Sequence, residues 1–115
     1  MKKIEAIIRK TKFEDVKEAV MANDIDWFEY VDVRGIGQSR QERIYRGVAY
    51  STDNIERVSI TIVLRDILVE KTIQVIMKAA HTGEIGDGRI FVSNVDECYS
   101  IRTGEKGDIV LRDKK

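Results

Sequence analysis

A glycine-rich turn in the C-terminal half carries the residues best suited to chemistry. The run from Thr82 to Phe91 reads TGEIGDGRIF and places three glycines directly before an arginine and an apolar segment. Glycine lets the backbone adopt positive φ and lets a ligand approach closely, so successive N–H groups can converge on an anion. Arg89 would add a positive charge and forked donors. The pattern indicates a phosphate-binding turn, with a plain helix-to-strand turn as the alternative.

The overall charge argues against nucleic acid as a partner. The chain has 115 residues, which favours a single domain over residues 1–115. Its 20 basic residues are balanced by 20 acidic ones. This balance does not predict the strongly basic face that non-specific nucleic-acid binding or a polybasic membrane anchor requires.

Cysteine usage and hydropathy predict a cytoplasmic protein. The single cysteine, Cys98, excludes an intrachain disulfide framework and a multi-cysteine metal site. The first residues, MKKIEAII, lack the long apolar run of a signal peptide. No apolar stretch approaches the roughly 20 residues that span a bilayer, so we expect no direct membrane insertion.

Hydrophobic periodicity predicts two helices and four main strands. Alternating apolar residues predict strands over residues 2–9 and 58–64, and β-branched and aromatic residues favour strands over 27–33 and 89–95. Apolar residues at helical spacing predict a helix from Phe13, with Thr11 and Glu14 as a capping box, that stops before Asn23. A second helix follows Asp66 as its cap and ends at Ala80.

The segment from Gln38 to about Asn54 shows no sustained period and is rich in charge. Structureless loops longer than about 12 to 15 residues are uncommon in compact domains and are usually functional or disordered. We interpret the segment as a working loop. A further short pairing is expected around Tyr99 to Arg102.

The order of the main elements defines the fold class. It reads βαββαβ, which is the split βαβ arrangement of the ferredoxin-like α+β fold. This arrangement has an antiparallel sheet with both helices on one face. Because the fold hosts many functions, the site must carry the functional interpretation.

Three segments resemble one family, the PII signal-transduction proteins. They are Gly35-Ile36-Gly37, the run Tyr45-Arg46-Gly47 followed by Tyr50, and residues 82–91. The likeness extends to residues 2–8 and 101–105 and so covers nearly the whole chain, as a divergent member. The resemblance implies a homotrimer with ATP or ADP in each cleft between neighbouring subunits. It also implies a partner-binding T-loop (about 37–55), a phosphate-binding B-loop (about 82–89) and a C-terminal segment (about 99–115).

The resemblance assigns roles residue by residue. Gly86, Asp87, Gly88 and Arg89 match the B-loop, with arginine where the family usually has lysine, and Arg102 matches a basic residue that reaches the nucleotide from the neighbouring subunit. The other positions matched to the nucleotide pocket or its rim are Ile7, Gly35, Ile36, Gly37, Gln38 and Val63. No catalytic residue and no dedicated metal-ligand set are assigned.

Several residues depart from the family pattern around the same pocket. Ser100 stands where the family has a second arginine, and Thr61 replaces a glutamate that faces the nucleotide. Trp27 and Glu29 occupy a stretch that tends to carry glycine and threonine near the adenine. The base and ribose contacts of this chain should therefore differ from those of typical members, and ATP or ADP remains the expected ligand.

Typical members also bind 2-oxoglutarate with Mg²⁺ and ATP through a glutamine after the second glycine of Gly35-Ile36-Gly37. Here the loop is one residue shorter, so either Gln38 or Ser39 falls at that place. A serine hydroxyl reaches less far than an amide and is a poorer magnesium ligand. Two interpretations follow: a sensor of ATP and ADP that has lost 2-oxoglutarate sensing, or a typical nitrogen regulator that binds Mg-ATP and 2-oxoglutarate.

Two loop residues match positions with partner roles in the family. Arg46 matches a residue that plugs the pore of ammonium channels, with a solvated arginine as the alternative. Tyr50 matches a tyrosine that some members have uridylylated, with a plain contact residue as the alternative. The resemblance implies a transporter or a metabolic enzyme as the protein partner.

Two other classes of function stay open. One is a small enzyme that binds a phosphorylated substrate through the glycine-rich turn. The chain has one histidine and no evident nucleophile–base set, which argues against catalysis. The other is a structural trimer similar to the divalent-cation-tolerance proteins, which would not need a phosphate-binding turn. We therefore predict a regulatory nucleotide-binding protein and not an enzyme.

Overall fold

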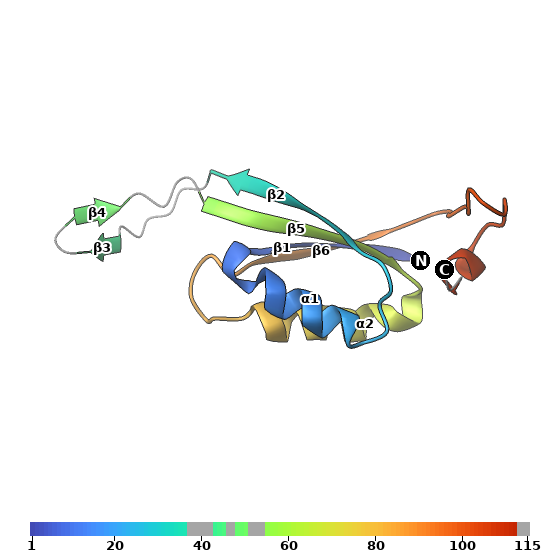
Figure 1. The fold of residues 1–115 in the computed structure, drawn as a ribbon, viewed down its shortest axis with the longest axis horizontal. Helices are drawn as coiled ribbons and strands as arrows, with labels where there is room; N and C mark the ends of the chain where they lie inside the picture. The colour runs from blue at the N-terminus through green and yellow to red at the C-terminus, as the bar shows by residue number, and fades with distance from the viewer. Residues whose placement is uncertain (37–42, 46–47, 51–54, 113–115) are drawn as a thin grey trace.

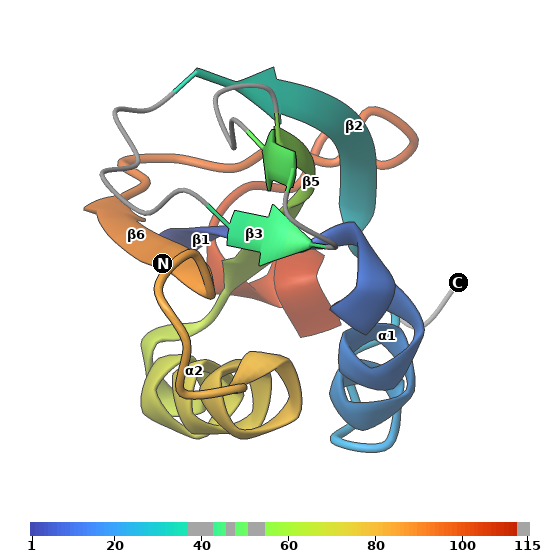
Figure 2. The ribbon, with the colours of Figure 1, turned by 90° about the vertical axis from the view of Figure 1, so that its left-hand side faces the viewer.

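A computed structural model describes residues 1–36, 43–45, 48–50 and 55–112. The main sheet has the strand order β2-β5-β1-β6 with every neighbouring pair antiparallel. Both helices lie on one face of this sheet (Figures 1 and 2), as the ferredoxin-like fold predicts. The elements are β1 (Lys2–Arg9), a 3₁₀ helix (Lys10–Lys12), α1 (Phe13–Met21), β2 (Glu29–Gly35), β3 (Arg43–Tyr45), β4 (Val48–Tyr50), β5 (Ile55–Leu64), α2 (Asp66–Ala80), β6 (Gly88–Asn94) and a second 3₁₀ helix (Asp108–Arg112).

The sheet has one buried face and one open face. Alternate residues of the two central strands are buried under the helices, and with the helical residues they form the core: Ile4, Ala6, Ile8, Val58, Ile60, Ile62 and Leu64 with Val16, Val20, Val69 and Ile76. Since successive strand residues point to opposite faces, the intervening residues lie on the open face. There Ile7 is paired with Arg89 on β6, and Lys3 with Val63 on β5.

The predicted helix caps are wrong. α1 follows a 3₁₀ turn, and its N-cap is Lys12, which makes no side-chain cap hydrogen bond, so Thr11 and Glu14 form no capping box. α2 has Arg65 as its N-cap, also without a side-chain bond, and Asp66 is its first helical residue. The Asp66 carboxylate instead lies 2.9 Å from the amino nitrogen of Met1. Packing of the apolar faces against the sheet, and not capping, therefore positions these helices.

The segment interpreted as a structureless loop contains a hairpin. β3 and β4 pair antiparallel, with Arg43 opposite Tyr50 and Tyr45 opposite Val48. Their β-branched and aromatic residues favour extended backbone and explain the pairing. β2 also runs two residues beyond its predicted end, because its pairing with β5 continues to Gly35 opposite Ile55.

The C-terminal segment lies at the end of the sheet where β5 and β6 end, opposite the turn that precedes β6 (Figure 1). The expected short pairing there is a single bridge between Tyr99 and Lys106. The Ser100 N–H donates to the Glu105 carbonyl at 2.8 Å, and Gly104 N–H to the Ser100 carbonyl at 2.9 Å. These bonds close a tight turn around Arg102.

Candidate functional site

The turn between α2 and β6 is organised around one carboxylate. Asp87 Oδ2 accepts the backbone N–H groups of Thr82 and Gly83, each at 2.9 Å, and Oδ1 accepts the Thr82 hydroxyl. These hydrogen bonds, with the one from the Thr82 hydroxyl foremost, hold the pKa of Asp87 well below its usual range. His81, at the C-terminal end of α2, places Nδ1 3.8 Å from Asp87 Oδ2. Asp87 thus fills the first half of the turn with an internal anion.

Two positions of the turn require glycine, each for a different structural reason. Gly88 has a φ of 115°, and a Cβ built there would overlap the backbone carbonyl oxygen of Ile7. Gly86 has a φ of 100°, and its Cβ would meet Arg57 Nη2 at 3.0 Å and Arg9 Nη2 at 3.4 Å. Gly88 therefore lets β6 reach β1, and Gly86 lets two guanidinium groups lie against the turn.

Three arginines gather on the open face beside this turn. Arg9 and Arg57 are cross-strand partners, and Arg89 is paired with Ile7 on the next strand. Arg9 donates from Nε to Asp87 at 3.1 Å and from Nη2 to the Ile85 carbonyl at 3.0 Å. Burial, and then the positive charge of Arg9, lower the pKa of Arg57. The residues Arg9, Arg57 and Arg89 define what we term the arginine end of the open face.

The arginine end has more positive than negative charge. Asp87 is the carboxylate that Arg9 binds, and the carboxylate of neighbouring Glu56 lies 3.6 Å from Lys10 Nζ. A hollow of about 300 Å³ beside the turn is lined by Arg9, Lys10, Thr11, Glu56 and Arg57. Because like charges held together in partly buried surroundings repel, a bound anion would stabilise this cluster.

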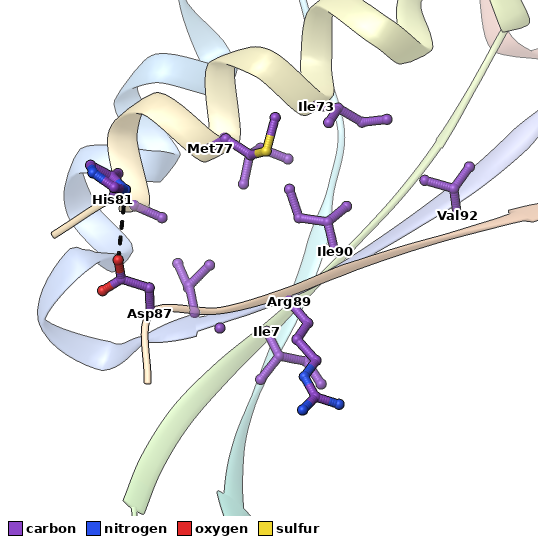
Figure 3. A pocket seen from close by; sticks show the side chains of 12 residues that line it. Ile7, Ile73, Met77, His81, Asp87, Arg89, Ile90 and Val92 are labelled. Atoms are coloured by element: carbon purple, nitrogen blue, oxygen red, sulfur yellow. Dashed lines mark ion pairs between the residues drawn. The ribbon is translucent and has the colours of Figure 1, made fainter. Parts of the chain in front are cut away.

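A larger hollow of about 400 Å³ lies on the helix side, between α2 and β6. Figure 3 shows Ile73, Met77 and Ile90 around it, while Arg89 extends from the opposite side of β6. This hollow is lined mainly by apolar side chains, so it is unsuited to phosphate groups. The chemistry expected of the glycine-rich turn therefore belongs to the open face.

The predicted site residues fall into two groups on this chain. Ile7, Gly35 and the turn residues Gly86, Asp87, Gly88 and Arg89 lie at the arginine end, where β1 and β2 end and β6 begins. Ile36 follows Gly35 and is 89% exposed. Val63 lies towards the other end of the sheet, where it pairs with Lys3. The C-terminal segment, which includes Arg102, lies at that end too (Figure 1). The seven residues of β6 span about 20 Å from the arginine end to this far end.

Part of the prediction lies outside the described residues. This holds for Gly37, Gln38 and Arg46. Tyr50 is the last residue of β4, and only its backbone is described. Arg9 and Arg57 were missed by the sequence reasoning. The strand alternation could have indicated them, because each occupies a polar position of its strand, Arg9 on β1 and Arg57 on β5. The two positions pair with each other beside the glycine-rich turn.

Comparisons with known proteins agree with this fold. The family model described as "Nitrogen regulatory protein P-II" matches residues 1–105. The chain is 47% identical to the nitrogen regulatory protein P-II of Azospirillum brasilense over 108 residues, which cover 93% of this chain and 96% of the relative. The corresponding protein of Bradyrhizobium diazoefficiens is 46% identical over the same shares, and that of Pyropia yezoensis is 43% identical over 91% of this chain and 95% of its own.

The fold and the turn define a ferredoxin-like α+β protein with a cation-rich end of the sheet. The chain belongs to the nitrogen regulatory protein P-II family. Proteins of this family are regulatory signal-transduction proteins and not enzymes, so the enzymatic alternative is set aside. Among the residues that the structure describes, no helix has the length and apolar character needed to cross a bilayer.

Proposed function

We propose that this protein is a nitrogen regulator that assembles as a homotrimer, binds ATP or ADP between neighbouring copies, and acts on a partner protein through residues 37–55. The observation that carries the proposal is the separation of the predicted nucleotide contacts. Arg89 and Arg102 lie at opposite ends of a sheet, so one chain cannot close both around a single nucleotide. A neighbouring copy supplies the missing half.

The arginine end would hold the phosphates. The N–H groups of Thr82 and Gly83 are engaged by Asp87, which leaves the second half of the turn, with Gly86 and Arg89, to face the ligand. Charge-assisted hydrogen bonds from a guanidinium contribute about 1.5 to 3 kcal/mol each. The turn is thus preorganised by an internal carboxylate before the external anion binds.

The comparisons favour a nitrogen regulator over a pure energy sensor, since the similar proteins carry that name. The structure offers a compatible second anion site. Arg9 and Arg57 lie beside Gly86, at the end of the sheet from which Gly35 leads towards Gln38. We assign this pair as the place where a carboxylate of 2-oxoglutarate would bind.

Magnesium would reach the site with the nucleotide. In the described part of the chain, no group of three His, Cys, Asp or Glu side chains could hold a metal ion. Mg²⁺ commonly keeps several waters and binds through substrate phosphates, which needs few protein ligands. Gln38 is the candidate side-chain ligand, and the metal would supply positive charge that favours binding of the phosphates and of a carboxylate.

Nucleotide identity would bias the partner-binding segment. Gly35 ends β2 at the arginine end and begins the path into residues 37–55. Contacts made only with the γ-phosphate would therefore act at the root of the segment, and a coupling of about 1 to 3 kcal/mol suffices for regulation.

Titration calorimetry tests the proposal. ATP and ADP should each bind, and 2-oxoglutarate should bind only with Mg²⁺ and ATP. Arg89→Ala and Arg102→Ala should each weaken ATP binding by about 10-fold or more. Lys71→Ala, which removes an exposed cation from α2, is the matched control and should change nothing. Unchanged ATP affinity in both arginine variants would refute the site.

A further inference from the structure

His81 is the one histidine of the chain, and it lies against the glycine-rich turn. It follows Ala80, the last residue of α2, and its N–H donates to the Met77 carbonyl at 3.1 Å. A Cβ built on Gly83 would lie 3.7 Å from His81 Nε2, so the imidazole lies beside the backbone of the turn. The ring is therefore placed between the helix and the turn.

One oxygen of Asp87 joins His81 to the turn. Asp87 Oδ2 accepts the N–H groups of Thr82 and Gly83 at 2.9 Å, and His81 Nδ1 lies 3.8 Å from the same oxygen (Figure 3). The His81 side chain is 74% exposed, so solvent screens this pair and its contribution to folding stability is small. The charge of His81 nevertheless acts beside the group that organises the turn.

Charged groups of two strands lie near this pair. Arg9 of β1 donates to Asp87 Oδ1 at 3.1 Å, whereas His81 lies against Oδ2. Arg89 belongs to β6, and its side chain extends from the opposite side of that strand (Figure 3). Neither arginine takes the place of the imidazole beside Oδ2, so Asp87 can pair with Arg9 and with a protonated His81 at the same time.

Two exposed charged residues are close to His81 in sequence. Lys78 lies in the last turn of α2, and Glu84 lies in the glycine-rich turn, where its N–H donates to the Thr82 hydroxyl at 3.2 Å. Their side chains have opposite charges, and salt screens charges that are exposed to solvent. The partly buried Asp87 is therefore the charged group that protonation of His81 affects most.

We propose that His81 is a positioning residue of the phosphate site, and that its protonation tightens the binding of nucleotide phosphates at the arginine end. This inference rests on the proposed nucleotide site. An imidazolium would help to hold Asp87 and the turn while adding a positive charge near the anion, and a bound ligand that displaces water would strengthen this charge. Histidine side chains lose their proton at about pH 6.5 in model peptides, so the site would respond to pH in the physiological range.

Two variants bracket the charge at this position. His81→Gln has no charge at any pH, and His81→Lys has a positive charge throughout the range from about pH 5.5 to about pH 8. In titration calorimetry at low salt, the ATP affinity of the parent protein relative to His81→Gln should rise about 2- to 3-fold from the upper to the lower pH. The affinity of His81→Lys relative to His81→Gln should stay constant, because neither side chain titrates. Protonation of ATP itself cancels in both ratios.

Lys78→Gln is the matched control, because it removes a cation from the same turn of α2 that keeps its charge throughout this range. The affinity ratio between the parent protein and Lys78→Gln should not change with pH. Inorganic tripolyphosphate should give the same ratios as ATP for all three variants, since the effect acts on the phosphates and not on the nucleoside.

The single imidazole gives an independent readout. If protonation of His81 tightens anion binding, linkage requires that a bound anion favours the protonated imidazole by the same factor. In proton NMR, the ring signals of His81 should therefore titrate about 0.3 to 0.5 pH units higher with saturating tripolyphosphate than without ligand, which corresponds to the 2- to 3-fold change in affinity.

The outcomes distinguish this inference from the proposed function. If neither ATP nor tripolyphosphate binds the parent protein at any pH, the nucleotide site is wrong and the role of His81 is wrong with it. If both ligands bind but the ratio of parent to His81→Gln is constant or falls in acid, the role of His81 is overturned while the site stands. A ring titration that tripolyphosphate leaves unchanged, or a pH-dependent ratio of His81→Lys to His81→Gln, would overturn it as well.

Discussion

The arginine end of the sheet and the far end, where β5 and β6 end, have opposite characters. At the arginine end, Asp87 and Arg9 lock a glycine-rich turn through hydrogen bonds of 2.9 to 3.1 Å. At the far end, the large apolar side chains of Trp27, which precedes β2, and Ile101 are exposed. One end is rich in charged side chains, and the other exposes apolar ones. Under the proposed function, the difference teaches that the two ends would be complementary parts of one site that meet across neighbouring copies.

The largest expected effect is on stability, and it differs between two glycines with positive φ that lie at the two ends. Gly88→Ala should destabilise the protein by more than about 3 kcal/mol or prevent folding, since its Cβ would overlap the Ile7 carbonyl oxygen. Gly104, in the C-terminal turn at the far end, has a φ of 76° with open space around it, so Gly104→Ala should cost only about 1 to 2 kcal/mol. Denaturant unfolding measures both. Equal losses would mean that the approach of β6 to β1 is not tightly fixed.

Arg9 and Arg57 should separate stability from binding within the arginine end. Arg57→Ala should weaken binding of 2-oxoglutarate in the presence of Mg-ATP by about 10-fold while leaving the unfolding free energy unchanged or slightly higher, because it relieves repulsion with Arg9. Arg9→Ala should weaken the same binding and also lower stability, because Arg9 holds Asp87 and Ile85. Calorimetry and thermal unfolding distinguish the two. If Arg57→Ala lost stability and Arg9→Ala did not, Arg57 and not Arg9 would be the arginine that holds the turn.

The depressed pKa of Asp87 predicts an acid-dependent loss of stability. The folded state favours the ionised carboxylate, so its contribution is complete above the ordinary carboxyl pKa of about 3.9 and fades as the pH falls towards the lowered native value. The difference in melting temperature between the parent protein and Asp87→Asn should therefore be largest near neutral pH and shrink below about pH 4. A difference that grows on acidification would contradict the role given to Asp87.

The smallest expected effect lies at the start of α2, directly after β5 at the far end of the sheet. Arg65 occupies the N-cap without a side-chain hydrogen bond to the helix. Arg65→Ser should raise the unfolding free energy by about 0.5 to 1 kcal/mol, because a serine oxygen can accept an orphan N–H. Arg65→Ala is the control and should bring no such gain. A loss of stability with serine would show that Arg65 has another structural role.

The sequence predicted the parts of the fold that depend on periodicity. Alternation at Ile4, Ala6 and Ile8 was enough for β1, because burial under two helices imposes it directly. The caps at Thr11 and Asp66 were predicted wrongly, because a local pattern does not say whether tertiary packing will replace it. The β3–β4 hairpin was missed because six strand residues amid charged neighbours give little periodic signal.

In the candidate site, too, the contiguous features could be predicted from the sequence, whereas those that depend on tertiary structure could not. The turn at residues 82–89 is recognisable because glycine and charge are contiguous in the sequence. Arg9 and Arg57 come from separate strands, and only the antiparallel register brings them against Gly86. The sequence also could not show that Asp87 accepts two N–H groups of the turn. Composition alone does not tell whether such N–H groups bind a carboxylate of the same chain or an anionic ligand.

Mixing two defective chains tests the central claim that the two ends meet across copies. Arg89→Ala and Arg102→Ala chains should each bind ATP weakly when produced alone. Co-expressed, they should form mixed trimers in which about one quarter of the clefts combine an intact Arg89 with an intact Arg102 from the neighbour. Calorimetry should then recover a matching fraction of tight ATP sites. No recovery in mixed trimers of confirmed composition would place both arginines in the same half of the cleft and contradict the account.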